Sequence, residues 1–418
     1  MKEVHSFLEH EIKKLPYKLL EGIIARKLTA AGIKNSEEIS PRVLEHALAG
    51  TLENFSWDDG STSDRTIKIS ITDEDLAELE NEFSRFLKDT LPEIIADTSK
   101  KTAVSTLRSL KKQWPEQRAW EENSLLAFRN NLEARWGRAL DLLRMLLTIS
   151  REIGAEWHNR TLRRKKSNLR EALFRIHVRS CQISAEIITL LENGYADGAL
   201  ARWRTLHEVC MVGLLLSEHG EPLAERYLAH RIVEAHRAAE EYSRNYLALG
   251  FKPISKRERM MIERNYKRAL AKFGKEFGSQ YGWASHHLKM KKPTFSDIER
   301  AVGVSSMRSF YKMASYNVHA TAQGMFFKLG LMDSSGVIAG ASNAGLTDPG
   351  QNTAVTLSVI TTLLFGPRYR FEDVLALHVL KLLQDEIPMV FWRADLKLRR
   401  DHKQHSREST KNPKVRQK

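Results

Sequence analysis

The chain has 418 residues, of which 42% are hydrophobic and 28% charged, so it can bury a sizeable core and is not disordered as a whole. Its two cysteines, Cys181 and Cys210, lack the spacing of a metal site and are too few for a disulfide framework, which favours a reducing compartment. The N-terminus has no apolar signal-peptide core, and no run reaches the roughly 20 apolar residues of a membrane span. We therefore expect a cytoplasmic protein without a transmembrane segment.

The net charge of +14 is distributed unevenly along the chain. Residues 1–100 hold 13 Lys and Arg against 20 Asp and Glu, whereas residues 393–418 hold 10 against 3. An acidic head, a basic body and a basic tail predict separate modules, and the charge of the body favours a polyanionic partner. A solvated basic surface without any such partner is the alternative.

Residues 1–100 predict a small, mainly helical module. The alternation of Ile67, Ile69 and Ile71 with polar residues is typical of a short strand or of an extended linker. Thr72 is a typical helix N-cap, and the three acidic residues after it favour the positive end of the helix dipole. The acidic charge of this module suggests a protein partner.

Residues 101–398 predict a basic helical-bundle domain. Apolar residues recur at helical spacing in the segments 125–153, 169–191, 198–217, 306–331 and 371–383, the last of which can extend to Leu398. Asn193-Gly194 is a typical helix C-terminus. The tail, residues 399–418, holds almost no large apolar residue, so we expect it to be disordered. The fold class is therefore all-α, and a membrane surface is a third, weaker candidate for a partner of the basic tail.

A cluster of cations lies between two of the predicted helices. Within residues 160–170 the chain carries Arg160, Arg163, Arg164, Lys165, Lys166 and Arg170. We predict that Arg163, Arg164, Lys165 and Lys166, together with Arg308, bind a nucleic acid, RNA before others, or another polyanion.

Two polar stripes interrupt otherwise apolar helices. Arg204 and Glu208 are spaced i,i+4 on a helix whose second half is apolar on all sides. Arg308, Tyr311, Ser315 and His319 recur every three or four residues, so they share a face of the predicted 306–331 helix. These side chains can exchange protons or bind an anion, which makes Arg204, Glu208, Tyr311, Ser315 and His319 candidate catalytic residues. The alternative is a pair of hydrogen-bonded seams that lock helices together.

His207 is a further catalytic candidate because it completes the pattern Arg202-x4-His207. That spacing is similar to the Arg-x4–6-His motif of HEPN-type helical ribonucleases, which act as dimers. The motif is weak here, since several other Arg and His residues match it by chance and Trp203 replaces the usual polar residue. A HEPN-like ribonuclease and a homodimer are therefore hypotheses.

No motif predicts a cofactor or a metal. The sequence has no Gly-x-x-x-x-Gly-Lys-Ser/Thr loop and no Gly-x-Gly-x-x-Gly fingerprint, which argues against nucleotide hydrolysis by a P-loop and against Rossmann redox chemistry. His230 and Glu234 could ligate a metal at i,i+4, but the paired Glu-x-x-His motifs of a di-iron bundle are missing. We therefore predict neither a metal nor another cofactor.

The two stripes also carry a resemblance. The helix around Arg204-x-x-x-Glu208 and the segment Tyr311-x3-Ser315-x3-His319 resemble a bacterial all-helical family known only as a domain of unknown function, over about residues 107–319. The resemblance implies a helical core with these residues in a shared site, and by analogy a toxin-like or phage-defence role. We predict an RNA- or polyanion-binding helical protein, with a non-catalytic protein-interaction module as the alternative.

Overall fold

The structure is a computed structural model that describes residues 2–50, 54–57, 65–304, 306–332, 336–366 and 370–411, with side chains described from residue 12 to residue 408. The chain divides into two compact units, Met1–Glu121 and Glu122–Lys418. We had predicted the boundary near residue 100. All regular elements among the described residues are helical, so the all-α prediction is confirmed.

The first unit consists of helices and one extended segment. Its helices are α1 (Lys2–Ala30), α2 (Ser36–Leu48), α3 (Asp73–Arg85) and the start of α4 (Leu91–Thr161), with a π-helical turn at Phe86–Thr90 between the last two. Thr72 caps α3 as predicted, because its hydroxyl accepts from the Asp75 N–H while the Asp75 carboxylate accepts from the Thr72 N–H.

A small core explains the alternating isoleucines of this unit. Ile24, Leu28, Ile39 and Leu44 are buried together between α1 and α2. Ile69 packs against this cluster from an extended segment that pairs with no strand in the described part of the chain. The period of two therefore belongs to an extended linker, the second of the two structures that the pattern allowed.

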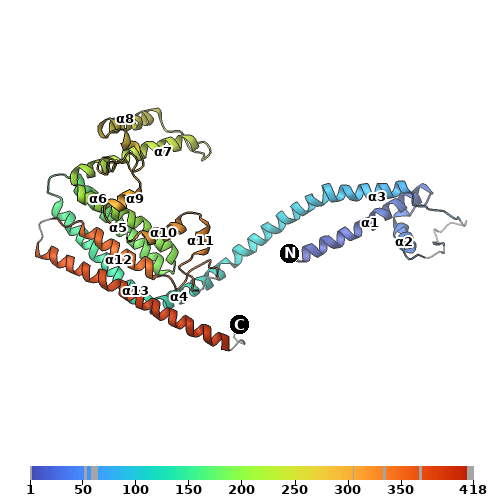
Figure 1. Ribbon diagram of the computed structural model, residues 1–418. Helices are drawn as coiled ribbons and strands as arrows, with labels where there is room; N and C mark the ends of the chain where they lie inside the picture. Colours follow the sequence, from blue (N-terminus) through green and yellow to red (C-terminus); the bar gives the residue numbers. More distant parts are fainter. Residues whose placement is uncertain are drawn as a thin grey trace. The chain divides into compact units, whose positions relative to one another are not determined.

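The second unit contains the main bundle (Figure 1). Its helices after α4 are α5 (Asn168–Glu192), α6 (Ala196–Ala229), α7 (Arg231–Asn245), α8 (Lys256–Phe273), α9 (Phe295–Ala301), α10 (Arg308–Val318), α11 (Ala322–Phe326), α12 (Thr347–Thr362) and α13 (Phe371–Lys411). Helices α5, α6, α12 and α13 lie side by side, whereas α7 and α8 form a hairpin that projects from them. Gly194 adopts a positive φ of 75° after α5, which is the backbone that the predicted C-terminus requires.

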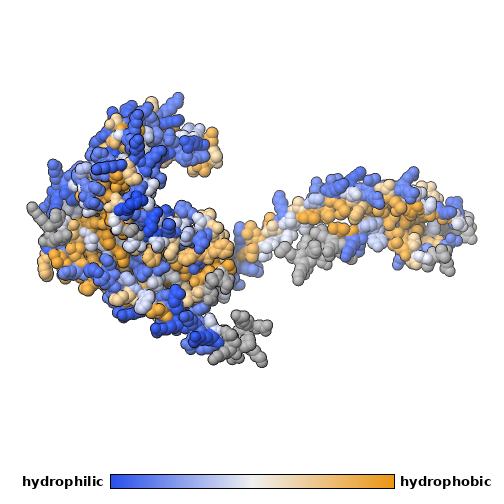
Figure 2. Space-filling view, in the orientation of Figure 1, coloured by the Kyte–Doolittle hydropathy of each residue, from blue (hydrophilic) through white to orange (hydrophobic). Residues whose placement is uncertain are grey.

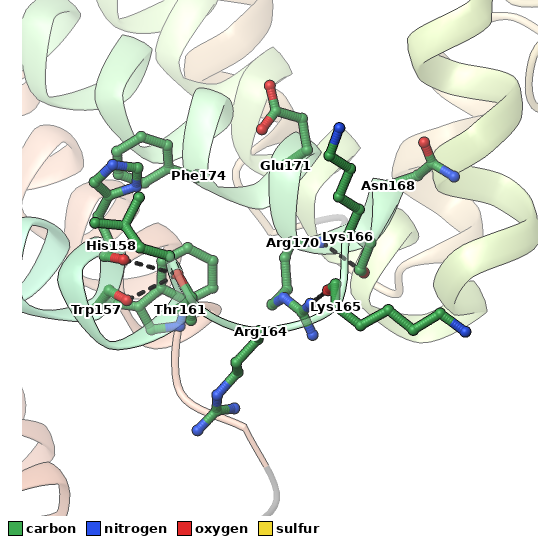
Figure 3. A pocket seen from close by; sticks show the side chains of 12 residues that line it. Trp157, His158, Thr161, Arg164, Lys165, Lys166, Asn168, Arg170, Glu171 and Phe174 are labelled. Carbon is green, nitrogen blue, oxygen red and sulfur yellow. Dashed lines mark hydrogen bonds between the residues drawn. The ribbon is translucent and has the colours of Figure 1, made fainter.

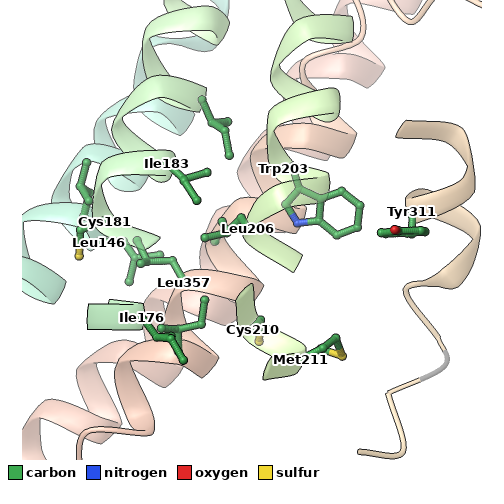
Figure 4. Close-up of a cluster of buried hydrophobic side chains, with 14 of the residues drawn as sticks. Leu146, Ile176, Cys181, Ile183, Trp203, Leu206, Cys210, Met211, Tyr311 and Leu357 are labelled. Atoms are coloured by element: carbon green, nitrogen blue, oxygen red, sulfur yellow. The ribbon is translucent and has the colours of Figure 1, made fainter. Parts of the chain in front are cut away.

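Large apolar side chains fill the space between these helices (Figure 4). Trp136 of α4 and Trp203 of α6 are both fully buried. Each indole N–H has an acceptor: Trp136 donates to Asn343, and Trp203 donates to the Thr356 hydroxyl at 3.0 Å. The buried donors are thus satisfied, and the core fixes α4, α6 and α12 against one another.

Two helix boundaries differ from the prediction. The 306–331 segment is not one helix: α10 ends at Val318, and His319 is its C-cap in an extended conformation. At the other end of the chain, α13 continues to Lys411 rather than ending at Leu398. Two ion pairs support the extension: Asp395 pairs with Arg399 of the next turn at 2.6 Å, and Arg135 of α4 pairs with Asp401 at 2.6 Å. Residues 412–418 of the predicted tail lie outside the described residues.

Within the described ranges, none of the helices has the length and hydropathy needed to cross a bilayer.

Candidate functional site

Tyr311 lies on α10 at the edge of the apolar core, on the side of Trp203 (Figure 4). It joins the two polar stripes. Its hydroxyl accepts a hydrogen bond from the Arg204 guanidinium at 2.8 Å and donates one to the Glu208 carboxylate at 2.7 Å. The guanidinium also lies 4.7 Å from the centre of the Tyr311 ring and pairs with Glu208 at 3.3 Å. Arg204, Glu208 and Tyr311, which the sequence places on two stripes and the resemblance places in one shared site, therefore form one cluster between α6 and α10.

The cluster keeps its tyrosine protonated. Burial and the hydrogen bond to Glu208 raise the pKa of Tyr311 above its ordinary value. The side chains of Arg204 and Glu208 remain 20% and 34% exposed, so both reach solvent while Tyr311 is buried. A neutral hydroxyl between a cation and an anion is suited to hold the two charges in place rather than to act as a nucleophile.

A second chain of contacts starts at His207, one residue before Glu208. His207 and Glu299 of α9 are both buried and lie 2.9 Å apart from Nε2 to Oε1. Glu299 also pairs with Arg308 at the surface end of this chain. Burial lowers the pKa of His207 and outweighs the hydrogen bond to Glu299. A neutral imidazole that donates to the carboxylate is the arrangement that satisfies both groups.

The last two residues of the second stripe do not join the cluster. The Ser315 hydroxyl donates to the Tyr311 carbonyl of its own helix at 2.9 Å. His319 lies beyond the end of α10 and is exposed. The reason is a long-range contact: the Asp197 carboxylate accepts from Asn317 and from the Leu329 N–H, which draws the chain away from the helical path. The predicted stripe thus breaks after Tyr311.

Arg202 and His207 of the ribonuclease-like motif point to different environments. Arg202 pairs with Glu186 of α5 at the surface. His207 is 1% exposed and is enclosed by Trp203, Phe295 and Tyr311. In this arrangement a substrate in solvent cannot touch the imidazole, so the geometry does not support His207 as a catalytic base.

The predicted basic cluster borders a different feature, a hollowed face of α4 and α5 (Figure 3). Three adjoining hollows of about 490, 660 and 530 Å³ are lined by residues of these helices and of the loop between them. His158 and Phe174 line all three. The basic residues around them are Arg151, Arg164, Lys165, Lys166, Arg170, Arg175, Arg179 and Arg202. We call this surface the α4–α5 groove.

Three aromatic rings lie parallel in the groove. The His158 ring stacks on Phe174 with 4.4 Å between ring centres and 13° between planes. Trp157 is also parallel to Phe174, at 5.9 Å. His158 and Phe174 are partly exposed. Flat rings beside cations are the combination that single-stranded nucleic acid meets in its binding proteins.

The basic residues near the groove differ in whether a carboxylate pairs with them. Among the described residues, no carboxylate pairs with the side chains of Lys165 or Lys166, whereas Arg175 is paired with Glu171. Arg163 is exposed beside the hollows but lines none of the three. Arg308 belongs to the Glu299 contact instead. The structure therefore brings three of the five predicted binding residues into the groove: Arg164, Lys165 and Lys166.

Glu221 of α6 holds the loop in place. Its carboxylate accepts from the N–H groups of Asn168 and Leu169, at 2.6 and 3.1 Å, and from the Ser167 hydroxyl at 2.7 Å. These hydrogen bonds lower the pKa of Glu221 although partial burial opposes the shift. The first amides of α5 are thus satisfied by a side chain, and any anion in the groove has to bind the side-chain cations.

Sequence reasoning missed several residues of both clusters. Glu299, His158 and Phe174 were not candidates, because each meets its partners only through tertiary packing. The signal that could have found His158 is its place one turn before the basic loop, on the helix that enters it. No comparable pattern marks Glu299.

The two thiols and His230 lie inside the second unit. Cys181 and Cys210 are both buried and free, and burial raises their pKa values to about 11 and about 12. His230 is buried and its Nε2 lies 3.0 Å from the Ser279 carbonyl, which occupies it. Across the described ranges, no group of three or more His, Cys, Asp or Glu side chains is placed to hold a metal ion.

Comparison with known proteins finds a family match for part of the chain. Residues 170–336 match the family of unknown function DUF5677. The predicted resemblance to an all-helical family without assigned function is thereby confirmed. No curated protein and no solved structure matches the chain. The DUF5677 region contains the whole Arg204–Tyr311 cluster and the α5 side of the groove, while Trp157, His158 and the basic loop precede it.

Proposed function

We propose that the protein binds single-stranded RNA along the α4–α5 groove. The observation that carries this proposal is the parallel stack of His158 and Phe174, which line hollows bordered by Lys165 and Lys166, two cations that pair with no carboxylate among the described residues. Stacking on a flat ring tolerates any base, and the cations attract the phosphates whatever the sequence. Binding would therefore have little sequence preference.

Shape and polarity of the groove support a single strand over a duplex. The three hollows of the groove share the same two rings, so unpaired bases can stack there. Bases in a duplex are stacked on each other and cannot reach such rings. Asn159 and Gln182 line the same surface and offer amide groups to base edges or to the ribose 2′-hydroxyl.

The Arg204–Tyr311 cluster is given a supporting role in this proposal. It joins α6 to α10 and, through His207 and Glu299, to α9. This network of contacts holds α6, against which α5 packs, to α9 and α10. We propose no part for His207 in the cleavage of bound RNA, because its imidazole is buried.

A titration of the full chain against fluorescently labelled RNA tests the proposal. Oligonucleotides of one mixed sequence, single-stranded or annealed to a complement, are followed by fluorescence anisotropy at 50 and 200 mM salt. We expect tighter binding of the single strand and a steep loss of affinity at the higher salt, because each phosphate contact releases counterions. Equal affinity for the duplex, or affinity that does not change with salt, would contradict the proposal.

A further inference from the structure

The free end of the α7–α8 hairpin exposes apolar side chains that the bundle does not use. The loop between the two helices carries Leu247, Leu249 and Phe251, which are 77%, 59% and 59% exposed. Met260 and Met261 follow on α8 and are exposed as well. Figure 2 shows hydrophobic surface at the end of the hairpin beside hydrophilic surface. An apolar group of this size on a projecting tip is typical of a docking surface.

The loop is held in one shape by its own contacts. The Tyr242 hydroxyl donates to the Lys252 carbonyl at 2.8 Å, and the Phe251 N–H donates to the Tyr246 carbonyl at 2.9 Å. The rings of Tyr242 and Phe251 are parallel, with 6.5 Å between their centres. At the base of the hairpin, His236 stacks on Tyr266 at 3.9 Å. The apolar side chains are therefore presented by an ordered loop.

Cations surround this apolar tip. Residues 242–259, which form the end of the hairpin, hold five Lys and Arg against one Glu. The basic residues are Arg244, Lys252, Lys256, Arg257 and Arg259. A second copy of the same tip would bring these like charges against each other, which opposes self-association. RNA would satisfy the cations but would leave the two leucines in water.

We propose that the end of the α7–α8 hairpin docks on an anionic membrane surface, with Leu247, Leu249 and Phe251 entering the bilayer interface. The surrounding Lys and Arg side chains would then contact the phosphate and carboxylate groups of the lipids. Tyr242 and Tyr246 lie where amphipathic rings are favoured, between the apolar tip and the charged helices. The proposal does not depend on RNA binding by the groove, which uses other residues.

Flotation of the full chain with lipid vesicles tests this inference. Vesicles of phosphatidylcholine alone are compared with vesicles that also contain phosphatidylserine. We expect the protein to float with the anionic vesicles and to stay at the bottom with the neutral ones. The variant Leu247→Ser/Leu249→Ser/Phe251→Ser should lose most of this flotation while it keeps its RNA affinity and thermal unfolding. The control Met325→Ser/Phe326→Ser removes exposed apolar groups of α11 and should float like the original chain.

A second measurement covers the case in which the triple variant is unstable. In Phe251→Trp the emission of the new indole is obtained as the difference from the original chain, which has eight tryptophans. It should shift to shorter wavelength when anionic vesicles are added, because the ring leaves water. Flotation of the triple variant equal to that of the original chain, or an unshifted emission, would overturn the inference. Loss of RNA binding by the triple variant with unchanged flotation would instead assign the tip to RNA and would also overturn it.

Discussion

The imidazole of His158 lies face to face with the ring of Phe174, 4.4 Å away and within 13° of parallel. One residue comes from the end of α4 and the other from α5, so the pair bridges the two sides of the basic loop. A base that stacks beside these rings places its phosphate near the loop cations. This geometry sets the first two expectations for RNA binding.

Removal of the aromatic ring at the centre of the groove should weaken RNA binding. We expect Phe174→Leu to lower the affinity for single-stranded RNA about 10-fold, since stacking contributes about 1–3 kcal/mol per base. Anisotropy titrations at one salt concentration measure the change. Phe326→Leu is the matched control, because Phe326 is exposed on α11 and lies outside the groove. An equal loss of RNA affinity in both variants would show that the Phe174 ring makes no specific contribution to binding.

Charge reversal in the loop should change the salt dependence. We expect Lys165→Glu/Lys166→Glu to reduce RNA affinity and to flatten the plot of log affinity against log salt, since two phosphate contacts are lost. The control is Lys111→Glu/Lys112→Glu, another adjacent pair of exposed lysines, located in the first unit. If both double variants lowered the slope equally, the effect would come from net charge rather than from the groove.

The Glu221 contacts should contribute to stability. Glu221→Ala removes the acceptor of the first α5 amides and should lower the free energy of unfolding by about 1 kcal/mol. Chemical denaturation of the variant and of Glu218→Ala gives the comparison, because Glu218 is exposed nearby and makes no hydrogen bond or ion pair among the described residues. The same loss in Glu218→Ala would refute a specific role of Glu221.

Tyr311 should matter for the fold even if it has no catalytic role. Tyr311→Phe leaves the partly buried Arg204 and Glu208 without their shared partner, so we expect a loss of about 1–3 kcal/mol in the free energy of unfolding. Ser315→Ala should cost less, because that hydroxyl only bonds to the backbone of its own helix. An unchanged stability in Tyr311→Phe would mean that the cluster is not a lock between α6 and α10.

Acid should destabilise the bundle through its buried histidines. Burial lowers the pKa of His177 from 6.5 to about 4, so between these values the unfolded chain binds a proton that the folded chain does not. His177 therefore favours folding fully above pH 6.5, and this contribution is lost as the pH falls towards 4, by about 3 kcal/mol in total.

The variant His177→Leu removes this titration. Its free energy of unfolding, measured by urea denaturation from pH 7 to pH 4.5, should fall less steeply with acid than that of the original chain. The control His319→Leu removes an exposed imidazole and shows what the loss of a surface histidine does to the same curve. A slope unchanged by His177→Leu would contradict the neutral, buried state of the imidazole.

Local signals predicted the elements well, and long-range contacts account for the differences. The Thr72 cap and the Asn193-Gly194 terminus depend on neighbours within four residues, so the sequence shows them directly. The end of α10 at Val318 depends on Asp197, more than a hundred residues away in the chain. Likewise Arg135 of α4 supports α13 beyond Leu398 by pairing with Asp401. Neither contact has a pattern that one sequence reveals.

The candidate sites likewise combine features that local sequence predicts with features that only tertiary packing creates. Spacing brought Arg204 and Glu208 onto one face, and the structure adds Tyr311 to them from another helix. The loop cations were visible as a run of basic residues, but the stack of His158 and Phe174 required the packing of α4 against α5. The basic residues of the surface can thus be predicted from the sequence. The hollow that they border cannot, because it depends on how α4 packs against α5.

The location of bound RNA is the most direct test of the proposed function. Single-stranded RNA that contains 4-thiouridine is cross-linked to the full chain by light, and the modified peptides are identified by mass spectrometry. We expect the cross-links to concentrate between Trp157 and Arg179, on the two sides of the α4–α5 groove. Cross-links that concentrate on the α7–α8 hairpin or on α13 with none in the groove, or no cross-links at all, would contradict it.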